Sequence, residues 1–249
     1  AARAPRDLPD YRWRRQYAGE VTLIVTNLGM VGRGDLPIAH PSLQWGEGEY
    51  LSGAGVWIGA IASDHLPHVS TGFAPTDPGA PAIHEFRSNP GPGNDIHTCW
   101  EESPGGDRAG MDENADDDAD GRVDEEFQNA LDDDDDGLID EDLACASAQM
   151  LNCETVDYTP ESQDDNPEHR PLGISLRQSS YSWIPRDDFT GRFVGFDLEF
   201  RNNGWELLRE VYLGIYADPD VGPLGHSGIE ADDRAEFLSI DTTFVDPSV

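Results

Sequence analysis

The sequence contains no lysine: all 16 of its basic residues are arginines, against 50 aspartates and glutamates in a chain of 249 residues. Without lysine, the chain cannot form a Schiff base with a carbonyl substrate or use an amine side chain as a general base. It also lacks the amine that isopeptide cross-links in some surface fibres require. Because the net charge of -34 repels nucleic acid and anionic membranes, we expect metal cations and basic protein segments as partners, and no nucleic acid.

Long apolar runs and the short motifs of common enzymes are also absent. No stretch approaches the roughly 18 apolar residues of a membrane-spanning helix, so we expect no membrane insertion. The G-x-S-x-G, phosphate-loop, dinucleotide-binding and H-E-x-x-H motifs do not occur. We therefore predict a non-enzyme, with no catalytic residues and no organic cofactor. An acid pair for glycoside hydrolysis stays open, because 50 acids place a pair at any spacing by chance.

Glycine and proline are abundant, at 26 and 18 residues, which is typical of short strands joined by turns. Alternation and β-branched residues predict strands at residues 20–27, 193–201 and 211–217, and large apolar residues interrupted by glycine predict closely packed strands at residues 48–63. We expect the first of these to be central, and the turn Asn202, Asn203, Gly204 to join residues 193–201 and 211–217 into a hairpin. Residues 70–94 are rich in Pro, Gly and Ser and predict an extended surface loop.

These elements predict an all-β fold, an antiparallel β-sandwich of the jelly-roll or Ig-like type. We expect residues 1–19 to form a basic N-terminal arm and residues 20–249 to form a single domain. Residues 111–145 interrupt that domain as an inserted Asp-rich calcium-loop segment. A last strand-like stretch, residues 236–245, would lie at a sheet edge, either unpaired or paired with another molecule.

The inserted segment contains two copies of an acidic repeat without a gap, at residues 116–131 and 132–147. Their signature is D-x-D-x-D-G-h-h-D-E-[DE]. Ca2+ takes about six to eight oxygen ligands, and such a loop offers carboxylates, one backbone carbonyl and a glycine for the sharp turn. The predicted ligands are Asp116, Asp118, Asp120, the carbonyl of Arg122, Asp124 and Glu126 in the first loop, and Asp132, Asp134, Asp136, the carbonyl of Leu138, Asp140 and Asp142 in the second.

The glutamate that closes an EF-hand loop is missing, because Phe127 and Leu143 stand at that position. Bidentate closure must then come from Asp124, Glu126, Asp140 or Asp142. The competing interpretation is a solvated acidic linker. The same glycine recurs in both copies, with Val123 or Ile139 two residues later, and this repetition favours ordered loops that bind two or more Ca2+ ions.

The roles of four smaller groups of residues stay open. Cys99, Cys145 and Cys153 allow a bridge between the first two, a short loop between the last two, or three buried thiols. Asp64, His65 and His68 offer transition-metal ligands, and residues 217–220 with Glu230, Asp232 and Asp233 offer either a further calcium site or capped turns. The aromatic residues that form either a saccharide-stacking platform or part of the core are Trp45, Tyr50, Trp57, Trp100, Trp183 and Trp205.

Four segments, TNLGMVG, EYLSGAGVWIGAI, the Asp loops and LREVYLGIYADPDVG followed by ADD, together resemble the N-terminal region of large uncharacterised bacterial secreted proteins. The loops themselves resemble the short calcium loops of dockerins and thrombospondin type 3 repeats. The resemblance spans most of residues 21–233. It implies a secreted protein with an extracellular or cell-surface location, and it implies no reaction.

The function that we expect is a secreted calcium-stabilised structural or assembly protein, a subunit of an extracellular filament or surface layer. The alternative is a carbohydrate-binding module or a domain of a secreted hydrolase. Self-association is expected through the N-terminal arm, where residues 1–15 hold five arginines and two aspartates, a net charge of +3. Such an arm adds as a strand to the open sheet edge of the next molecule, unless it folds back on its own domain or stays disordered.

Chelation of calcium should disorder residues 112–142 and lower the thermal stability of the protein. Arg122 is the only cationic side chain among these carboxylates, which repel one another when no metal is bound. Thermal melts in excess chelator and in millimolar calcium test this, and the calcium sample should melt at the higher temperature. Two indistinguishable curves would contradict the calcium loops.

Overall fold

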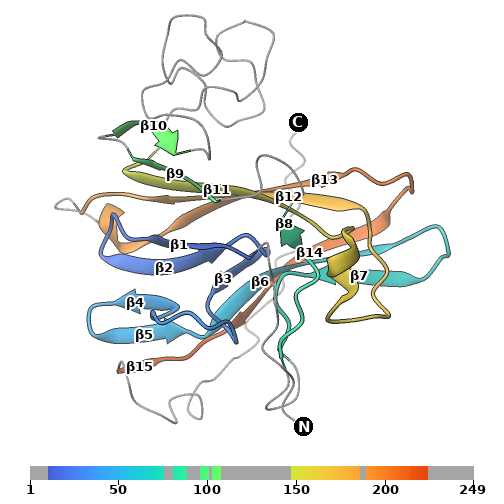
Figure 1. Ribbon diagram of the computed structural model, residues 1–249, viewed down its shortest axis with the longest axis horizontal. Helices are drawn as coiled ribbons and strands as arrows, with labels where there is room; N and C mark the ends of the chain where they lie inside the picture. The colour runs from blue at the N-terminus through green and yellow to red at the C-terminus, as the bar shows by residue number, and fades with distance from the viewer. Residues whose placement is uncertain are drawn as a thin grey trace, which may run out of the picture.

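The computed structural model describes residues 11–75, 81–88, 96–100, 103–107, 147–185 and 189–223. In this part, the chain forms one antiparallel sheet of nine strands and a second of six, and the two stack as a β-sandwich (Figure 1). The helical content described is two 3-10 turns, η1 (Pro160–Gln163) and η2 (Thr190–Arg192). The predicted all-β sandwich is therefore confirmed, while the inserted Asp-rich segment lies outside the described residues.

The nine-stranded sheet holds the N-terminal strands and two strands from the C-terminal half. Strand β1 (Trp13–Gln16) pairs with β2, and β7 (Pro67–Thr71) pairs with β6. The order of the others is β14 (Arg209–Asp218), β6 (Gly53–Ile61), β3 (Met30–Gly32), β2 (Val21–Thr26), β4 (Leu43–Trp45), β5 (Gly48–Leu51) and β15 (Gly222–Pro223). Since Val25 pairs with Arg14 on one side and with Val31 on the other, the predicted central position of β2 is confirmed.

The six-stranded sheet holds the strands on both sides of the acidic segment. Strand β8 (Arg87–Ser88) pairs with β11. The order of the others is β10 (Ser103–Asp107), β9 (His97–Trp100), β11 (Gln149–Val156), β12 (Ile174–Ser182) and β13 (Gly195–Asn202).

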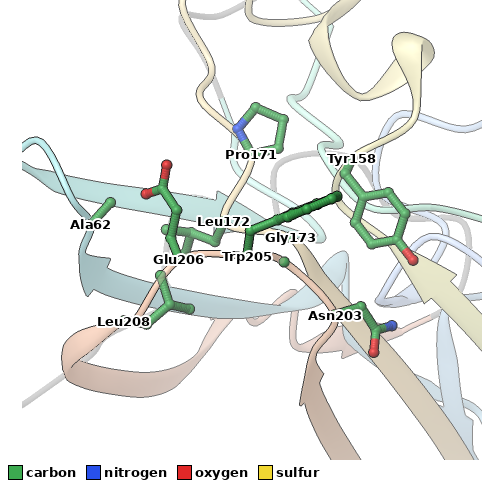
Figure 2. Close-up of a pocket in the computed structure, with 10 residues that line it drawn as sticks. Ala62, Tyr158, Pro171, Leu172, Gly173, Asn203, Trp205, Glu206 and Leu208 are labelled. Atoms are coloured by element: carbon green, nitrogen blue, oxygen red, sulfur yellow. The ribbon is translucent and has the colours of Figure 1, made fainter.

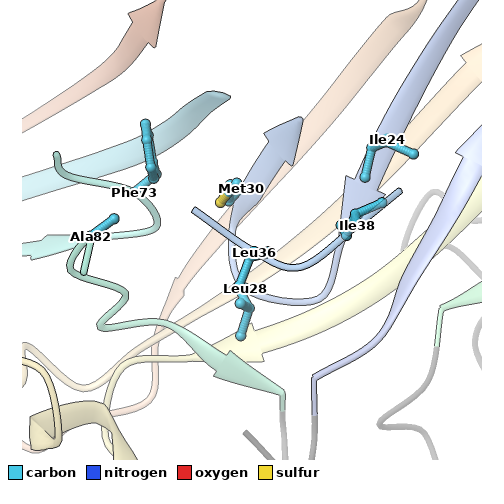
Figure 3. Packing of buried hydrophobic residues seen from close by; sticks show 7 residues of the cluster. All are labelled: Ile24, Leu28, Met30, Leu36, Ile38, Phe73 and Ala82. Carbon is cyan, nitrogen blue, oxygen red and sulfur yellow. The ribbon is translucent and has the colours of Figure 1, made fainter. Parts of the chain in front are cut away.

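The hydrophobic core lies between the sheets and is built from both halves of the chain. Val56 and Ile58 of β6 pack in one cluster with Ile174 and Leu176 of β12. A second cluster, drawn in Figure 3, lies around β2 and β3 and consists of Ile24, Leu28, Met30, Leu36, Ile38, Phe73 and Ala82. Strands before and after the acidic segment therefore share one core.

The prediction of a surface loop at residues 70–94 is wrong for the residues that the structure describes there. Phe73, His84 and Phe86 are buried. The segment crosses the core closely: a Cβ on Gly72 would lie 2.0 Å from the carbonyl oxygen of Gly29. The buried imidazole of His84 is satisfied by the Gly72 carbonyl, 2.8 Å from Nδ1. Gly72 therefore permits close packing instead of marking an exposed loop.

The predicted hairpin between residues 193–201 and 211–217 is also wrong. Strand β13 pairs with β12 in one sheet, and β14 pairs with β6 in the other. The connection, residues 203–208, is longer than the roughly two to five residues of tight hairpin loops, and it crosses between the sheets. The alternating pattern correctly indicated two strands, but it carries no information about their partners.

Part of the predicted N-terminal arm belongs to the domain. Because Trp13–Gln16 pairs with β2, this stretch takes the alternative in which the arm folds back on its own domain. The buried Gln16 accepts a hydrogen bond from the Ser180 hydroxyl, 2.9 Å away in the other sheet. Gln149 accepts from the Tyr17 N–H (2.6 Å) and donates to the Arg15 carbonyl (2.8 Å). These glutamines join the two sheets, and residues 1–10 lie outside the described part.

Gln149→Ala should destabilise the protein by about 2–4 kcal/mol. The reason is that the N–H groups of Tyr17 and Ala18 and the carbonyl of Arg15 would lose their partly buried hydrogen-bond partner. Urea unfolding would measure the change. Gln44→Ala is the matched control, because its amide bonds the Gly46 carbonyl in an exposed turn and should contribute little. A loss below about 1 kcal/mol for Gln149→Ala would contradict the bridging role.

Candidate functional site

The predicted calcium ligands, from Asp116 to Asp142, all lie outside the described residues. The structure does describe the two strands that flank the segment. Strand β10 ends at Asp107 and β11 begins at Gln149, and β9 pairs with both of them. The acidic segment therefore leaves and re-enters one sheet on the two sides of the same strand. Across the described ranges, no group of three or more His, Cys, Asp or Glu side chains is arranged to hold a metal ion.

The cysteine prediction stays a prediction. Cys145 and the side chain of Cys99 lie outside the described part of the chain. Cys153 is buried in β11, with its sulfur 3.7 Å from the Thr26 carbonyl oxygen. Glu230, Asp232 and Asp233, the candidates for a further calcium site near residues 217–220, also lie outside the described residues.

Asp64 and His68 come together in the structure as parts of an ion-pair network. His68 Nε2 lies 2.8 Å from Asp64 Oδ2, and the guanidinium of Arg170 pairs with the same carboxylate. Arg170 also pairs with Glu206 at 2.8 Å. His65 is exposed. The side chain that lies beside Asp64 and His68 is thus the cation Arg170, which makes this group unsuitable for a transition metal.

The candidate aromatic platform is dispersed over the molecule. Trp57 stacks on Tyr216 with ring centroids 5.8 Å apart, and its indole N–H donates to the Phe73 carbonyl. Trp183 packs on Phe193, and Trp45 lies near Tyr50. The side chain of Trp100 is outside the described part. Trp205 differs from the other aromatic candidates in that its side chain is fully exposed.

The candidate site is an open pocket of about 380 Å³ beside the β13–β14 connection (Figure 2). Two aromatic rings, four apolar side chains, two polar side chains and two glycines line it. These residues are Tyr158 and Trp205, Ala62, Pro171, Leu172 and Leu208, Asn203 and Glu206, and Gly173 and Gly204. The mixture of apolar walls with a few polar groups is characteristic of ligand pockets.

The connection that forms one wall is held in place by its own asparagines. Asn202 accepts a hydrogen bond from the Gly204 N–H (2.9 Å) and donates to the Glu206 carbonyl (3.0 Å). The Asn203 N–H donates to the Gly173 carbonyl at 2.8 Å. Gly173 has φ +78°, and a Cβ on it would lie 2.8 Å from the Gly204 Cα. Only glycine permits this close approach of the two backbones.

The opposite wall is held by a buried carboxylate. Asp157 accepts hydrogen bonds from the Leu172 and Ile174 N–H groups and from the Ser70 hydroxyl, each at 2.7 Å. Tyr158 follows it directly in the chain and is partly exposed at the pocket. The position of this wall is therefore fixed by hydrogen bonds to both sheets.

Electrostatics keep the carboxylates near the pocket ionised. The Leu66 N–H donates to Asp64 and, with help from Arg170, lowers the pKa of that carboxyl to about 2. The Ser63 N–H and Arg170 likewise lower the pKa of Glu206. Neither group is poised to donate a proton near neutral pH, so the arrangement suits binding better than acid–base chemistry.

Sequence reasoning found this site only in part. Trp205 was among the aromatic candidates and Asn203 belonged to a predicted turn, but Tyr158, Arg170 and Glu206 carried no signal. They lie far apart in the chain, and no motif links them. The pairing of Asp64 with Arg170 depends on the crossing between the sheets, which the hairpin prediction missed.

No family model matches the chain, and neither a curated protein nor a solved structure was found that matches it. Among the described residues, no helix has the length and apolar character needed to cross a membrane. Functional inference therefore rests on the site itself.

Asp64→Asn should lower the melting temperature at neutral pH but not near pH 2. The folded-state pKa of about 2 lies below the ordinary 3.8, so the ionised carboxylate stabilises the fold above about pH 4. This contribution is lost as the pH falls from about 4 through about 2. Melting curves of both proteins between pH 7 and pH 2 would show the difference shrink, with Glu47→Gln at an exposed turn as the control. A difference independent of pH would contradict the ion-pair role.

Proposed function

We propose that this chain is a secreted, calcium-stabilised structural protein whose copies assemble into an extracellular filament or surface layer. The two Asp-rich repeats support the calcium part of the proposal, because they supply oxygen ligands at loop spacing. The observation that carries the assembly part is an open side of the sandwich, at strands β13 and β14.

Strand β14 extends the core-facing side of its sheet beyond the cover of the other sheet. In the register with β6, Ile215 pairs with Val56 and Leu213 with Ile58, so each pair points to the same face. Val56 and Ile58 are buried, whereas Leu213 is 58% exposed and Ile215 is 69% exposed. A strand added beside β13 would cover these two side chains.

The gap beside β13 is a shallow apolar cleft. It has a volume of about 180 Å³, and residues of β3 and β6 are among those that line it. In the described part, β12 is the only strand that pairs with β13. The side chains of β13 and β14 that line the cleft are Phe196, Leu198 and Ile215. An edge of this kind, apolar on its inner face, is a site for strand addition.

Residues 236–245 (EFLSIDTTFV) of a neighbouring copy are the occupant that we assign to this edge. Their alternation places Leu238, Ile240 and Phe244 on one face and mostly polar side chains on the other. The apolar face suits the exposed row of β14, and the backbone suits the edge of β13. A contact between two different surfaces repeats from copy to copy and builds a filament.

Calcium has a second role in this proposal. Copies that each carry a charge of -34 repel one another, and bound Ca2+ reduces that charge where it is most concentrated. The expected contact through the N-terminal arm remains part of the proposal only for residues 1–10, since β1 is already paired within its own sheet.

Leu213→Asp should weaken assembly by about 30-fold or more, because it buries a carboxylate at an apolar contact at a cost of about 2 kcal/mol or more. Ile240→Asp in the assigned occupant should have the same effect. Tyr212→Asp changes an equally exposed side chain on the outer face of β14 and should assemble like the wild type. Light scattering in millimolar calcium over a range of protein concentrations would measure the masses.

A wild-type protein that stays monomeric at high concentration with calcium would overturn the assembly proposal. In that case the same segment would close the edge of its own molecule, and Ile240→Asp would lower the melting temperature without changing the mass.

A further inference from the structure

Trp205 is the most exposed of the large apolar side chains in the described part of the chain, with a relative exposure of 103%. Its indole therefore gains nothing from packing within the fold. A side chain of this size is normally at least partly covered. Trp205 stands at the tip of the β13–β14 connection and lines the 380 Å³ pocket (Figure 2).

The backbone that carries Trp205 is fixed on both sides of the residue. Before it, Asn202 holds the Gly204 N–H at 2.9 Å. After it, the Glu206 carboxylate receives the Arg170 guanidinium at 2.8 and 2.9 Å and the Ser63 N–H at 3.1 Å. A backbone that is already fixed lowers the conformational entropy that is lost when a ligand covers the aromatic ring. This is the arrangement of a binding anchor.

The pocket provides a second ring and polar groups around this anchor. Tyr158 lines the same pocket and is 43% exposed, and Leu172 and Leu208 supply apolar walls. The Asn203 side chain also lines the pocket, with its amide nitrogen donating to the Ser175 hydroxyl at 2.9 Å. A ligand that fits must present an apolar face to an indole and hydroxyl groups to polar neighbours at its edge. A pyranose ring has this combination, with C–H groups on its faces and hydroxyls around its rim.

Charge decides between neutral and ionic ligands. Arg170 is already paired with the carboxylates of Asp64 and Glu206, and the described residues that line the pocket include no basic side chain to hold an acidic sugar. The chain also carries a net charge of -34, which repels sulfated and uronic-acid polymers. An apolar protein segment would use the walls and the indole, but it would offer no hydroxyl group to the Tyr158 hydroxyl at the pocket.

We propose that this pocket is a binding site for a neutral saccharide, with Trp205 stacking on a sugar ring and Tyr158 as the second aromatic contact. The site does not depend on assembly, because its lining residues do not overlap those of the β13–β14 cleft. A structural protein with such a site would be attached to glycans of its surroundings.

The test uses the full chain in millimolar calcium and five neutral hexasaccharides as probes, namely the β-1,4-linked oligomers of glucose, N-acetylglucosamine, mannose and xylose and the α-1,4-linked oligomer of glucose. Calorimetric titration should show binding of at least one of them. Because Trp205 is exposed, its fluorescence should shift to shorter wavelength when a sugar covers the indole, and this shift should be absent in Trp205→Ala.

Four variants separate the site from the rest of the molecule. Trp205→Ala should weaken binding at least about tenfold, and Trp205→Phe should keep part of it because a ring remains. Trp45→Ala removes another exposed tryptophan, on β4 and outside the pocket, and should bind like the wild type. Asn202→Ala, which frees the connection without touching the pocket walls, should weaken binding about threefold or more.

Failure of all five probes to bind would overturn the proposal, and so would undiminished binding by Trp205→Ala. If Trp205→Ala instead lowers only the self-association of the protein, the pocket is a protein contact and the saccharide proposal is wrong. Leu213→Asp should bind the saccharide as the wild type does. The test of saccharide binding is therefore independent of whether the assembly proposal holds.

Discussion

Asp157 buries its carboxylate at the end of β11, where donors from both sheets converge on it. The donors are two backbone N–H groups at the entry to β12 and the hydroxyl of Ser70 on β7. A buried carboxylate is tolerated only when its oxygens are satisfied, so the approach of the two sheets at this point is tightly specified. The same hydrogen bonds set the course of residues 171–174, and thereby one wall of the pocket.

The other wall depends on a more exposed set of charges. Arg170 lies next to the segment that Asp157 fixes, and it pairs with Asp64 after β6 and with Glu206 in the β13–β14 connection. Ion pairs of this exposure contribute little to stability individually. Their effect here is positional, because one guanidinium holds three chain segments that are distant in sequence. The buried carboxylate and the exposed network together give the Trp205 connection a defined shape.

Much of the fold follows from the sequence, and the part that does not has a physical cause. Residues 20–27 alternate, residues 48–63 carry large apolar side chains interrupted by glycine, and they form β2, β5 and β6 where expected. The prediction for residues 70–94 was wrong because Gly72 packs closely against Gly29, and no local sequence pattern reveals this contact. Of the pocket, the exposed Trp205 could be picked out as an aromatic candidate. Arg170 and Glu206 could not, since their roles exist only once the sheets are stacked.

The crossing of residues 203–208 between the sheets accounts for two surfaces of the molecule, the exposed apolar row of β14 and the pocket beside Trp205. If β13 and β14 paired as a hairpin, each would satisfy the free edge of the other, and their apolar rows would lie on one sheet. Because they belong to different sheets, each of them pairs on one side only within the described part of the chain, and Leu213 and Ile215 of β14 are exposed. The crossing also brings Glu206 to Arg170 and sets Trp205 above the Asp157 wall. One topological choice therefore produces both the edge to which we assign a strand and the pocket to which we assign a saccharide, and a change that restored the hairpin would remove both.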